Sequence, residues 1–243
     1  MKDLFSDHSN AYAKYRPGYP PELIEIICSV CENHNKVWDC ATGNGQMALL
    51  LAPYFKHVLA SDISKNQIAV APSIHNITYS VQPAENTNYP DRSFDLVVVA
   101  QAIHWFDFDA FWKEVKRVLK PGGIVALTGY GLASINERID QVVYQLYQPI
   151  LSAYWPPERA HIENEYASIP FPFERVDVPE LVNKKQWPLD HFLGYLRTWS
   201  AAKRYQQDLG HDPIELIRED LEQLWDTKTV VSFPLLLKIG RNL

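Results

Sequence analysis

A loop with two glycines and two carboxylates carries the first chemical signal in this sequence. Asp39 opens the run Asp-Cys-Ala-Thr-Gly-Asn-Gly-Gln over residues 39–46, and a second acid, Asp62, follows the next apolar run. Gly43 and Gly45 permit tight turns and close approach of a ligand, because they lack a Cβ atom. Asp62 is placed to accept hydrogen bonds from a ribose diol. Taken alone, the same residues also fit a plain turn with an acid that caps a helix.

The position of Asp39 distinguishes between two cofactor classes. The spacing Gly43-x-Gly45-x-x-Ala48 approximates a nicotinamide dinucleotide fingerprint, which keeps an NAD-dependent oxidoreductase as an alternative. A carboxylate ahead of the glycines would repel a pyrophosphate. It would attract an ammonium group with about 4 kcal/mol of Coulomb energy at about 4 Å and an effective dielectric near 20. A cofactor with an amino acid end and no phosphate suits the loop better, which predicts S-adenosylmethionine.

His104 is the candidate catalytic residue. It follows a central apolar run, at the edge where ligands bind, and the ordinary pKa of histidine lies near neutrality. A phenol or a protonated amine acceptor needs a base, whereas a carboxylate does not. The alternative role for His104 is to orient Trp105 or the cofactor. Methyl transfer is an in-line displacement, so the protein mainly aligns the reactants and excludes water.

Aromatic and basic residues mark two further candidate regions. The N-terminal segment with Tyr12, Tyr15 and Arg16 is predicted to form a lid over the cofactor. Arg16 would pair with the cofactor carboxylate or with a substrate acid. Ordinary docking of an N-terminal arm is the alternative. In the later half, Trp187 and Trp199 belong either to the core or to an aromatic acceptor pocket. The candidate acceptor-binding residues are Tyr12, Trp105 and Trp199.

Alternating strands and helices must position these residues. After a helix predicted from Pro21 to about Glu32, short apolar runs alternate with segments of helical periodicity. The predicted strands are Val37–Cys40, Val58–Ser61, Ile77–Val81, Phe94–Ala100 and Ile124–Thr128. The predicted helices between them are Gln46–Ala52, Lys65–Ala71 and Phe108–Leu119. This order predicts an α/β, Rossmann-like, mostly parallel sheet with helices on both faces and ligands beyond the carboxyl ends of its strands.

The alternation stops after Thr128. We expect helices over 135–150, 189–207 and 213–226, a strand over 176–186, and a final strand over Val230–Ile239. This part should complete the sheet and form a cap rather than an independent domain.

The sequence resembles class I S-adenosylmethionine-dependent methyltransferases over nearly its whole length. The matching motifs are the loop Asp39–Gly45, Asp62, Ala84-Glu85, Phe94-Asp95-Leu96-Val97, the segment 101–106 and the turn Leu119–Gly123. The resemblance implies seven strands with a helical cap inserted after the fifth. It also implies one domain over 1–243, with a lid at 1–20, a cofactor-binding core at 36–129, a cap and sheet-completing segment at 130–228, and a final strand at 229–240.

Within that family, the implied cofactor-binding residues are Arg16, Asp39, Ala41, Thr42, Gly43, Gly45, Asp62, Ile63, Ala84, Glu85 and Gln101. The loop and Asp39 would hold the methionine part, and Asp62 the ribose hydroxyls. Ala84-Glu85 falls where the family contacts adenine. The segments 5–20, 100–106 and 195–200 resemble the trans-aconitate methyltransferase-like branch, whose members methylate small molecules. A small carboxylic acid is therefore one expected acceptor, with phenols and amines as alternatives.

The sequence departs from the family pattern at two positions. Ala41 stands where the first glycine of the loop is usual, which a small residue tolerates if its φ is negative. Pro83 stands where many relatives carry Asp, so recognition of the adenine amino group would shift to Glu85 or to the backbone. A methyltransferase-like binding module without turnover remains a third interpretation, although Gly43, Gly45 and Asp62 are intact.

Composition excludes several other classes. The chain has 243 residues and a formal net charge of −6, which makes a nucleic-acid surface unlikely. No apolar run is long enough for a membrane helix, so a cytoplasmic protein is expected. An odd number of cysteines, three, argues against a disulfide framework, and Cys28-x-x-Cys31 fits a buried helix face better than a zinc site. No motif requires a metal, and the sequence does not indicate an oligomeric state.

Overall fold

The computed structural model describes residues 14–243, so Tyr12 lies outside the described residues. Its centre is one sheet in the order β3-β2-β1-β4-β5-β8-β6, with β7 also paired to β8. The strands β1 (Lys36–Cys40), β2 (His57–Asp62), β3 (Ile77–Val81), β4 (Phe94–Ala100) and β5 (Leu119–Tyr130) run parallel. Strand order reverses between β1 and β4, which is where an open α/β sheet binds its ligand.

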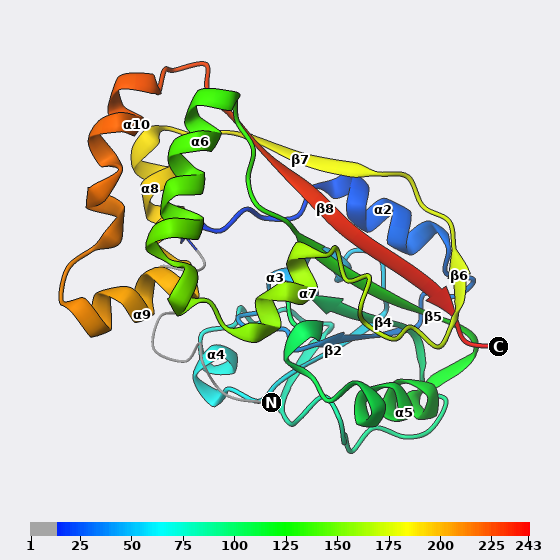
Figure 1. Ribbon diagram of the computed structural model, residues 1–243. Helices are drawn as coiled ribbons and strands as arrows, with labels where there is room; N and C mark the ends of the chain where they lie inside the picture. The colour runs from blue at the N-terminus through cyan, green and yellow to red at the C-terminus, as the bar shows by residue number, and fades with distance from the viewer. Residues whose placement is uncertain (1–13) are drawn as a thin grey trace.

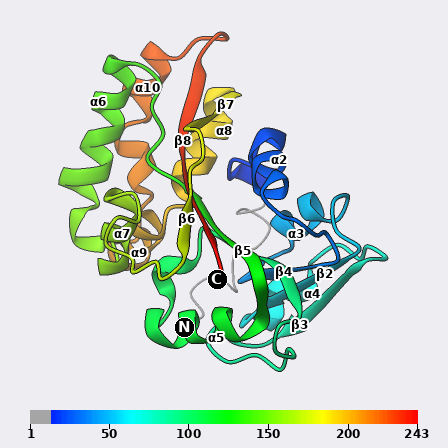
Figure 2. The ribbon, with the colours of Figure 1, turned by 90° about the vertical axis from the view of Figure 1, so that its right-hand side faces the viewer.

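Helices cover both faces of this parallel part (Figures 1 and 2). Strand β4 is buried along almost its whole length, because its apolar residues face helices on either side. On one face lie α2 (Pro21–Ser29) and α3 (Gln46–Leu51). On the other lies α5 (Phe108–Val118), which packs Phe111 and Val115 against the sheet. The short helix α4 (Lys65–Ala69) connects β2 to β3.

Two long strands carry the cap. Strand β8 (Val230–Arg241) runs antiparallel to β5, from Ile124 opposite Arg241 to Tyr130 opposite Leu235. At Ile124 of β5 and Ile239 of β8, the two strands pack in the sheet core. At Tyr130 and Phe233 they pack in a separate apolar cluster. That cluster joins the cap helices α6 (Glu137–Gln145), α8 (Leu189–Arg197), α9 (Ser200–Leu209) and α10 (Arg218–Leu224). Figure 1 shows these four helices grouped at the left of the molecule, away from the end where β6 lies.

The predicted architecture is confirmed, with three refinements in the later half. The seventh position of the sheet is shared by two short strands, β6 (Glu174–Val176) and β7 (Leu181–Gln186). They pair with opposite ends of β8, so the sheet has eight strands where seven were expected. The helix predicted over 189–207 is two helices, α8 and α9, separated at Thr198 and Trp199. The 135–150 segment changes from α6 into a π-helical turn over Leu146–Ile150, which contains Pro149.

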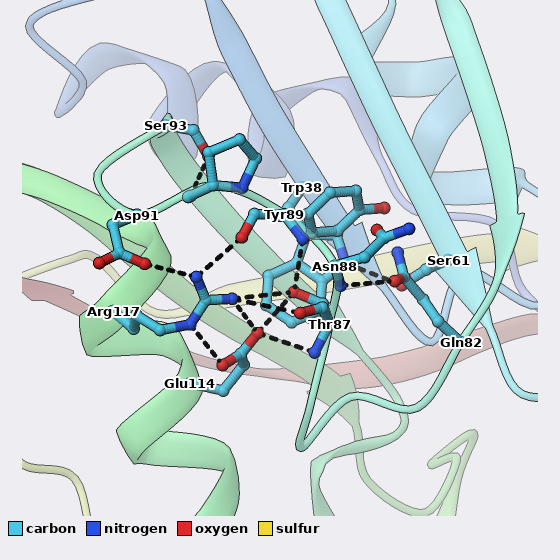
Figure 3. Close-up of polar contacts among 11 residues, drawn as sticks. Trp38, Ser61, Gln82, Thr87, Asn88, Tyr89, Asp91, Ser93, Glu114 and Arg117 are labelled. Atoms are coloured by element: carbon cyan, nitrogen blue, oxygen red, sulfur yellow. Dashed lines mark hydrogen bonds and ion pairs between the residues drawn. The ribbon is translucent and has the colours of Figure 1, made fainter.

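The connection from β3 to β4 is held by side chains of α5. In the described chain, residues 82–93 form no helix. Glu114 accepts hydrogen bonds from Thr87 N (2.8 Å) and Thr87 Oγ1 (2.5 Å), and it forms an ion pair with Arg117 (2.6 Å). Arg117 also pairs with Asp91 at 2.6 Å (Figure 3). Burial alone would raise the pKa of Glu114. The hydrogen bonds from Arg117 and Thr87 outweigh burial and leave this pKa below its ordinary value. This network fixes the loop that follows Ala84-Glu85.

Candidate active site

A cleft opens at the carboxyl ends of β1, β2 and β4, where the sequence analysis predicts the ligand site. Its volume is about 990 Å³ out to the open mouth. The lining residues come from the N-terminal segment, the glycine loop, the ends of β2 and β4, and the end of β5. They are Arg16, Pro17, Tyr19, Asp39, Ala41, Thr42, Gly43, Asn44, Gln46, Met47, Asp62, Ile63, Ser64, Gln67, Ala100, Gln101, Ala102, Trp105 and Tyr130.

The glycine loop follows an unusual backbone path. Ala41, Gly43 and Gly45 all have positive φ, at 56°, 57° and 87°. The condition under which alanine is tolerated here, a negative φ, is therefore not met, and Ala41 takes a left-handed conformation that a Cβ atom disfavours. Gly45 has a second reason to lack a side chain, because a Cβ there would lie 2.5 Å from Tyr79 Oη. The loop is shaped by its backbone before any side chain reaches the ligand.

Asp39 lies fully buried at the end of β1. The Thr42 hydroxyl donates a hydrogen bond to its Oδ2 atom, while Oδ1 has no hydrogen-bond partner among the described residues. Burial raises the pKa of Asp39 to about 7; the Thr42 and Ala48 hydrogen bonds lower it and the nearby Asp62 raises it. A buried carboxylate with an uncompensated oxygen that lines a cleft is a site for a cationic group.

Asp62 ties the second strand to the loop. Its Oδ2 accepts a hydrogen bond from Gly43 N at 2.9 Å, and its Oδ1 accepts one from Ser64 N at 2.8 Å. A carboxylate oxygen can accept more than one hydrogen bond, so both oxygens can still receive ribose hydroxyls. The residue that follows, Ile63, supplies an apolar surface beside them. The chemistry of this donor and acceptor set fits a nucleoside with an ammonium-bearing tail.

A second pocket adjoins the first and reaches into the cap. Its volume out to the open mouth is about 610 Å³. Four residues line both pockets: Arg16, Gln101, Trp105 and Tyr130. We call these four residues the junction. The remaining residues of this cap pocket are His104, Gly131, Trp155, Pro156, Arg159, Ile162, Tyr195, Trp199 and Ser200.

The junction is held by contacts between the two halves of the molecule. Arg16 donates from Nε to Thr198 Oγ1 (2.7 Å) and from Nη1 to Tyr130 Oη (3.1 Å). Gln101 has φ 57° and donates from its backbone to Thr128 O at 2.8 Å. Its side-chain amide donates to Tyr130 O at 3.2 Å. These bonds join the N-terminal segment, the end of β4, the end of β5 and the cap at one place.

His104 faces the cap pocket and does not line the first cleft. It is 7% exposed, and its Nδ1 has no hydrogen-bond partner among the described residues. Burial, followed by the charges of Arg159 and His161, lowers the pKa of His104 to about 3. The imidazole is therefore neutral at physiological pH but only weakly basic, and this low basicity weakens the case for it as a general base.

Most predicted site residues meet at these two pockets. Arg16, Asp39, Ala41, Thr42, Gly43, Asp62, Ile63 and Gln101 line the first cleft, Trp105 lines both, and His104 and Trp199 line the cap pocket. Gly45 lies just behind the loop and begins α3. Ala84 and Glu85 line neither pocket: Ala84 is buried in the core, and Glu85 accepts a hydrogen bond from Asp107 N at 3.4 Å. Their adenine role stays a prediction.

Sequence reasoning missed most of the cap pocket. Tyr130 had a usable signal, since it ends the fifth strand at the ligand edge. Trp155 and Arg159 had none, because they lie in short irregular turns without periodicity. In the described part of the chain, 14–243, no group of side chains is arranged to hold a metal ion. The same residues contain no helix long and apolar enough to cross a membrane.

The fold and the cleft define a Rossmann-like, nucleoside-binding α/β protein, and comparison with known proteins makes this specific. Residues 38–127 match the family described as methyltransferase domain. A Dictyostelium discoideum protein with a provisional methyltransferase designation is 34% identical over 99% of this chain and 95% of its own. A solved structure from Anaeromyxobacter dehalogenans, provisionally designated a type II methyltransferase, is 40% identical. It has a TM-score of 0.88 and covers 94% of this chain and 99% of its own.

A more distant likeness supports the fold alone. A phosphoethanolamine N-methyltransferase from Haemonchus contortus, solved with phosphomonomethylethanolamine and S-adenosylhomocysteine, is 20% identical with a TM-score of 0.51. It covers 98% of this chain and 57% of its own. Taken with the two full-length similarities, these findings show that the chain belongs to the class I S-adenosylmethionine-dependent methyltransferases. S-adenosylmethionine is the methyl donor of this family, so the dinucleotide alternative is not supported.

Proposed function

We propose that this methyltransferase transfers the methyl group of S-adenosylmethionine to a small acidic molecule bound in the cap pocket. The observation that carries the proposal is the junction: a cleft suited to the cofactor and a second pocket meet at Arg16, Gln101, Trp105 and Tyr130. An in-line displacement needs an opening of this kind, because the acceptor must approach the methyl carbon opposite the sulfur. Neither pocket is complete without both halves, so residues 1–243 would act as one catalytic unit.

The proposed cofactor contacts follow from the cleft. Asp39 would bind the ammonium group of the methionine part, the loop 41–45 would follow the amino acid backbone, and Asp62 would bind the ribose hydroxyls. Arg16 lies at the junction, where it can pair with the cofactor carboxylate or with an acidic acceptor. With the segment around it, Arg16 would act as the lid expected from the sequence.

The acidic acceptor is supported by the charges of the cap pocket. Among the described residues, its lining includes Arg16 and Arg159 but no Asp or Glu. A carboxylate acceptor is ionised at neutral pH and needs no base. Its oxygen would form the new bond to the methyl carbon while the carbon–sulfur bond breaks, which gives an ester and S-adenosylhomocysteine. His104, neutral in this pocket, would then orient the acceptor through a hydrogen bond rather than take its proton. The motifs at 5–20, 100–106 and 195–200 support placement near the trans-aconitate methyltransferase-like branch.

Two measurements test this proposal. Titration calorimetry with S-adenosylmethionine, S-adenosylhomocysteine and NAD should show binding of the two sulfur nucleosides and none of NAD. Transfer of radiolabelled methyl to a panel of small acids with two or more carboxylates, with the matching amides as controls, should label the acids alone. Labelling of amines or phenols instead would reject the acidic acceptor and keep the methyltransferase.

A further inference from the structure

The cap pocket contains an arginine that is held in place without an acidic partner. Arg159 ends the 3-10 turn Pro157–Arg159, directly before α7 (Ala160–Glu163). Its guanidinium lies 5.0 Å from the centre of the Trp155 ring and 5.4 Å from that of Tyr147. Its Nε donates a hydrogen bond to Tyr147 Oη at 2.9 Å. The aromatic contacts and this bond fix the side chain, so binding an anion costs little further ordering.

Glu163 could form an ion pair with Arg159, but its carboxylate is hydrogen-bonded to Tyr147 instead. Glu163 lies one helical turn after Arg159, at a spacing where ion pairs commonly form. Its carboxylate instead accepts a hydrogen bond from the Tyr147 hydroxyl. Within residues 14–243, Arg159 forms no ion pair. Tyr147 therefore has two effects: it orients the guanidinium and keeps Glu163 from forming a direct ion pair with it.

The position of Arg159 relative to the cofactor separates two parts of the acceptor. Arg159 lines the cap pocket but not the cofactor cleft, whereas the junction residues line both. A group bound to Arg159 thus lies in the part of the cap pocket that the cofactor cleft does not share. Trp199 and Tyr195 line the same pocket, so part of its wall is aromatic.

We propose that Arg159 binds a carboxylate of the acceptor that is distinct from the atom receiving the methyl group, and that Tyr147 is a positioning residue for it. The planar guanidinium presents paired N–H groups that match a carboxylate. The substrate class is then a small, flat or aromatic acid, with its reacting atom at the junction and a second, anionic end in the cap. This inference rests on the proposed function, because it takes the first cleft as the cofactor site.

Calorimetry on the protein saturated with S-adenosylhomocysteine tests the proposal, with phenylacetate and phenylacetamide as probes that differ in charge and little in shape. The wild-type protein should bind phenylacetate about 10- to 100-fold more tightly than the amide, as expected for charge-assisted hydrogen bonds in a closed pocket. Arg159→Gln should abolish this preference while its affinity for S-adenosylhomocysteine stays unchanged. Arg138→Gln, which removes the same charge from an exposed position on α6, should behave as wild type.

The outcomes separate the inference from the proposed function. Loss of S-adenosylhomocysteine binding by the wild-type protein would reject the cofactor site itself. Normal cofactor binding with no preference for phenylacetate, or with a preference that survives in Arg159→Gln, would overturn the role of Arg159. Tighter binding of phenyl phosphate than of phenylacetate would overturn the carboxylate assignment. With S-adenosylmethionine present, phenylacetate should bind without being methylated; formation of methyl phenylacetate would place the Arg159-bound carboxylate at the reacting position and overturn the separation.

A double-variant series tests Tyr147. Tyr147→Phe should weaken phenylacetate binding several-fold, because Glu163 is released to pair with Arg159. Tyr147→Phe with Glu163→Gln should recover most of the affinity, since the competing charge is gone. A merely structural role for Tyr147 predicts no recovery in the double variant, and that result would overturn the positioning role.

Discussion

The cofactor cleft and the cap pocket are built in opposite ways. The cleft is formed largely by backbone at the ends of neighbouring parallel strands, where Thr42, Gly43 and Asp62 line it. The cap pocket is formed by long side chains, such as Trp155, Arg159 and Trp199, from turns and helices far apart in sequence. The first arrangement fixes a ligand common to a whole family. The second can change residue by residue, which fits the proposal that it binds the acceptor and sets specificity.

The largest expected effect is on the cofactor side, in Asp39→Asn. Loss of the buried negative charge should weaken S-adenosylmethionine binding about 100-fold, since a charge pair in this setting contributes a few kcal/mol. Binding of phenylacetate in the cap pocket should change little by comparison. Calorimetry with each ligand measures both effects, and an equal loss of both would show that the two pockets are not independent.

The same variant should also alter the pH dependence of stability. The pKa of Asp39 is raised from 3.8 to about 7, so the native state holds a proton that the unfolded state has already released. The wild-type protein without cofactor should lose stability relative to Asp39→Asn as pH rises from about 4 to 7. Thermal unfolding at pH 4.5 and pH 8 checks this, and a constant difference would contradict a raised pKa.

Gly45→Ala should be the next largest change, and it is structural. The new Cβ would lie 2.5 Å from Tyr79 Oη, at a residue whose φ is 87°. We expect a loss of about 2–3 kcal/mol in the free energy of unfolding, from the left-handed backbone and the overpacking together. Gly122→Ala is the matched control, because Gly122 has φ 75° with open space around it. It should lose only the backbone part, about 1 kcal/mol. Equal losses in urea denaturation would remove the role of Tyr79.

On the cap side, His104 links stability to pH in the opposite direction. Its pKa is lowered from 6.5 to about 3, so the unfolded state binds a proton that the native state refuses as pH falls below 6.5. The wild-type protein should lose roughly 2 kcal/mol relative to His104→Gln between pH 7.5 and pH 5. Urea denaturation at the two pH values measures this difference. In the methyl-transfer assay, His104→Gln should raise the KM for the acceptor and leave cofactor affinity unchanged. A large fall in cofactor affinity would instead assign His104 a role in the cofactor cleft.

Ala41→Gly should give the smallest effect, and a favourable one. Ala41 holds φ 56°, and its methyl group packs partly buried against the sheet core. Glycine relieves the backbone but loses this contact and is freer in the unfolded chain, so it should stabilise the protein by no more than about 0.5–1 kcal/mol. Cofactor affinity should be unchanged within about two-fold. Destabilisation would mean that the methyl group packs usefully against the loop or its ligand.

The sequence alone determined the parallel core and the cofactor class. The alternation of apolar runs with helical periodicity is a local property, and residues at the ends of parallel strands such as Asp39 and Asp62 must meet at one edge of the sheet. The short β6 and β7 and the division of the 189–207 segment were harder to predict. Their positions depend on pairing with β8 and on packing within the cap, which are long-range contacts.

Tertiary structure decided the conformation of Ala41, the burial of His104 and the whole of the cap pocket. The φ of Ala41 is imposed by the loop that joins β1 to α3, against the preference of alanine itself. The lowered pKa of His104 arises from burial and from the nearby charges of Arg159 and His161, which are distant in sequence. Arg159 stands over Trp155 and Tyr147, which are near it in sequence, but it lines one pocket with His104 and Trp105 only because the cap packs against the end of the sheet. A periodic pattern records which face a residue buries, but not which distant side chain it meets there.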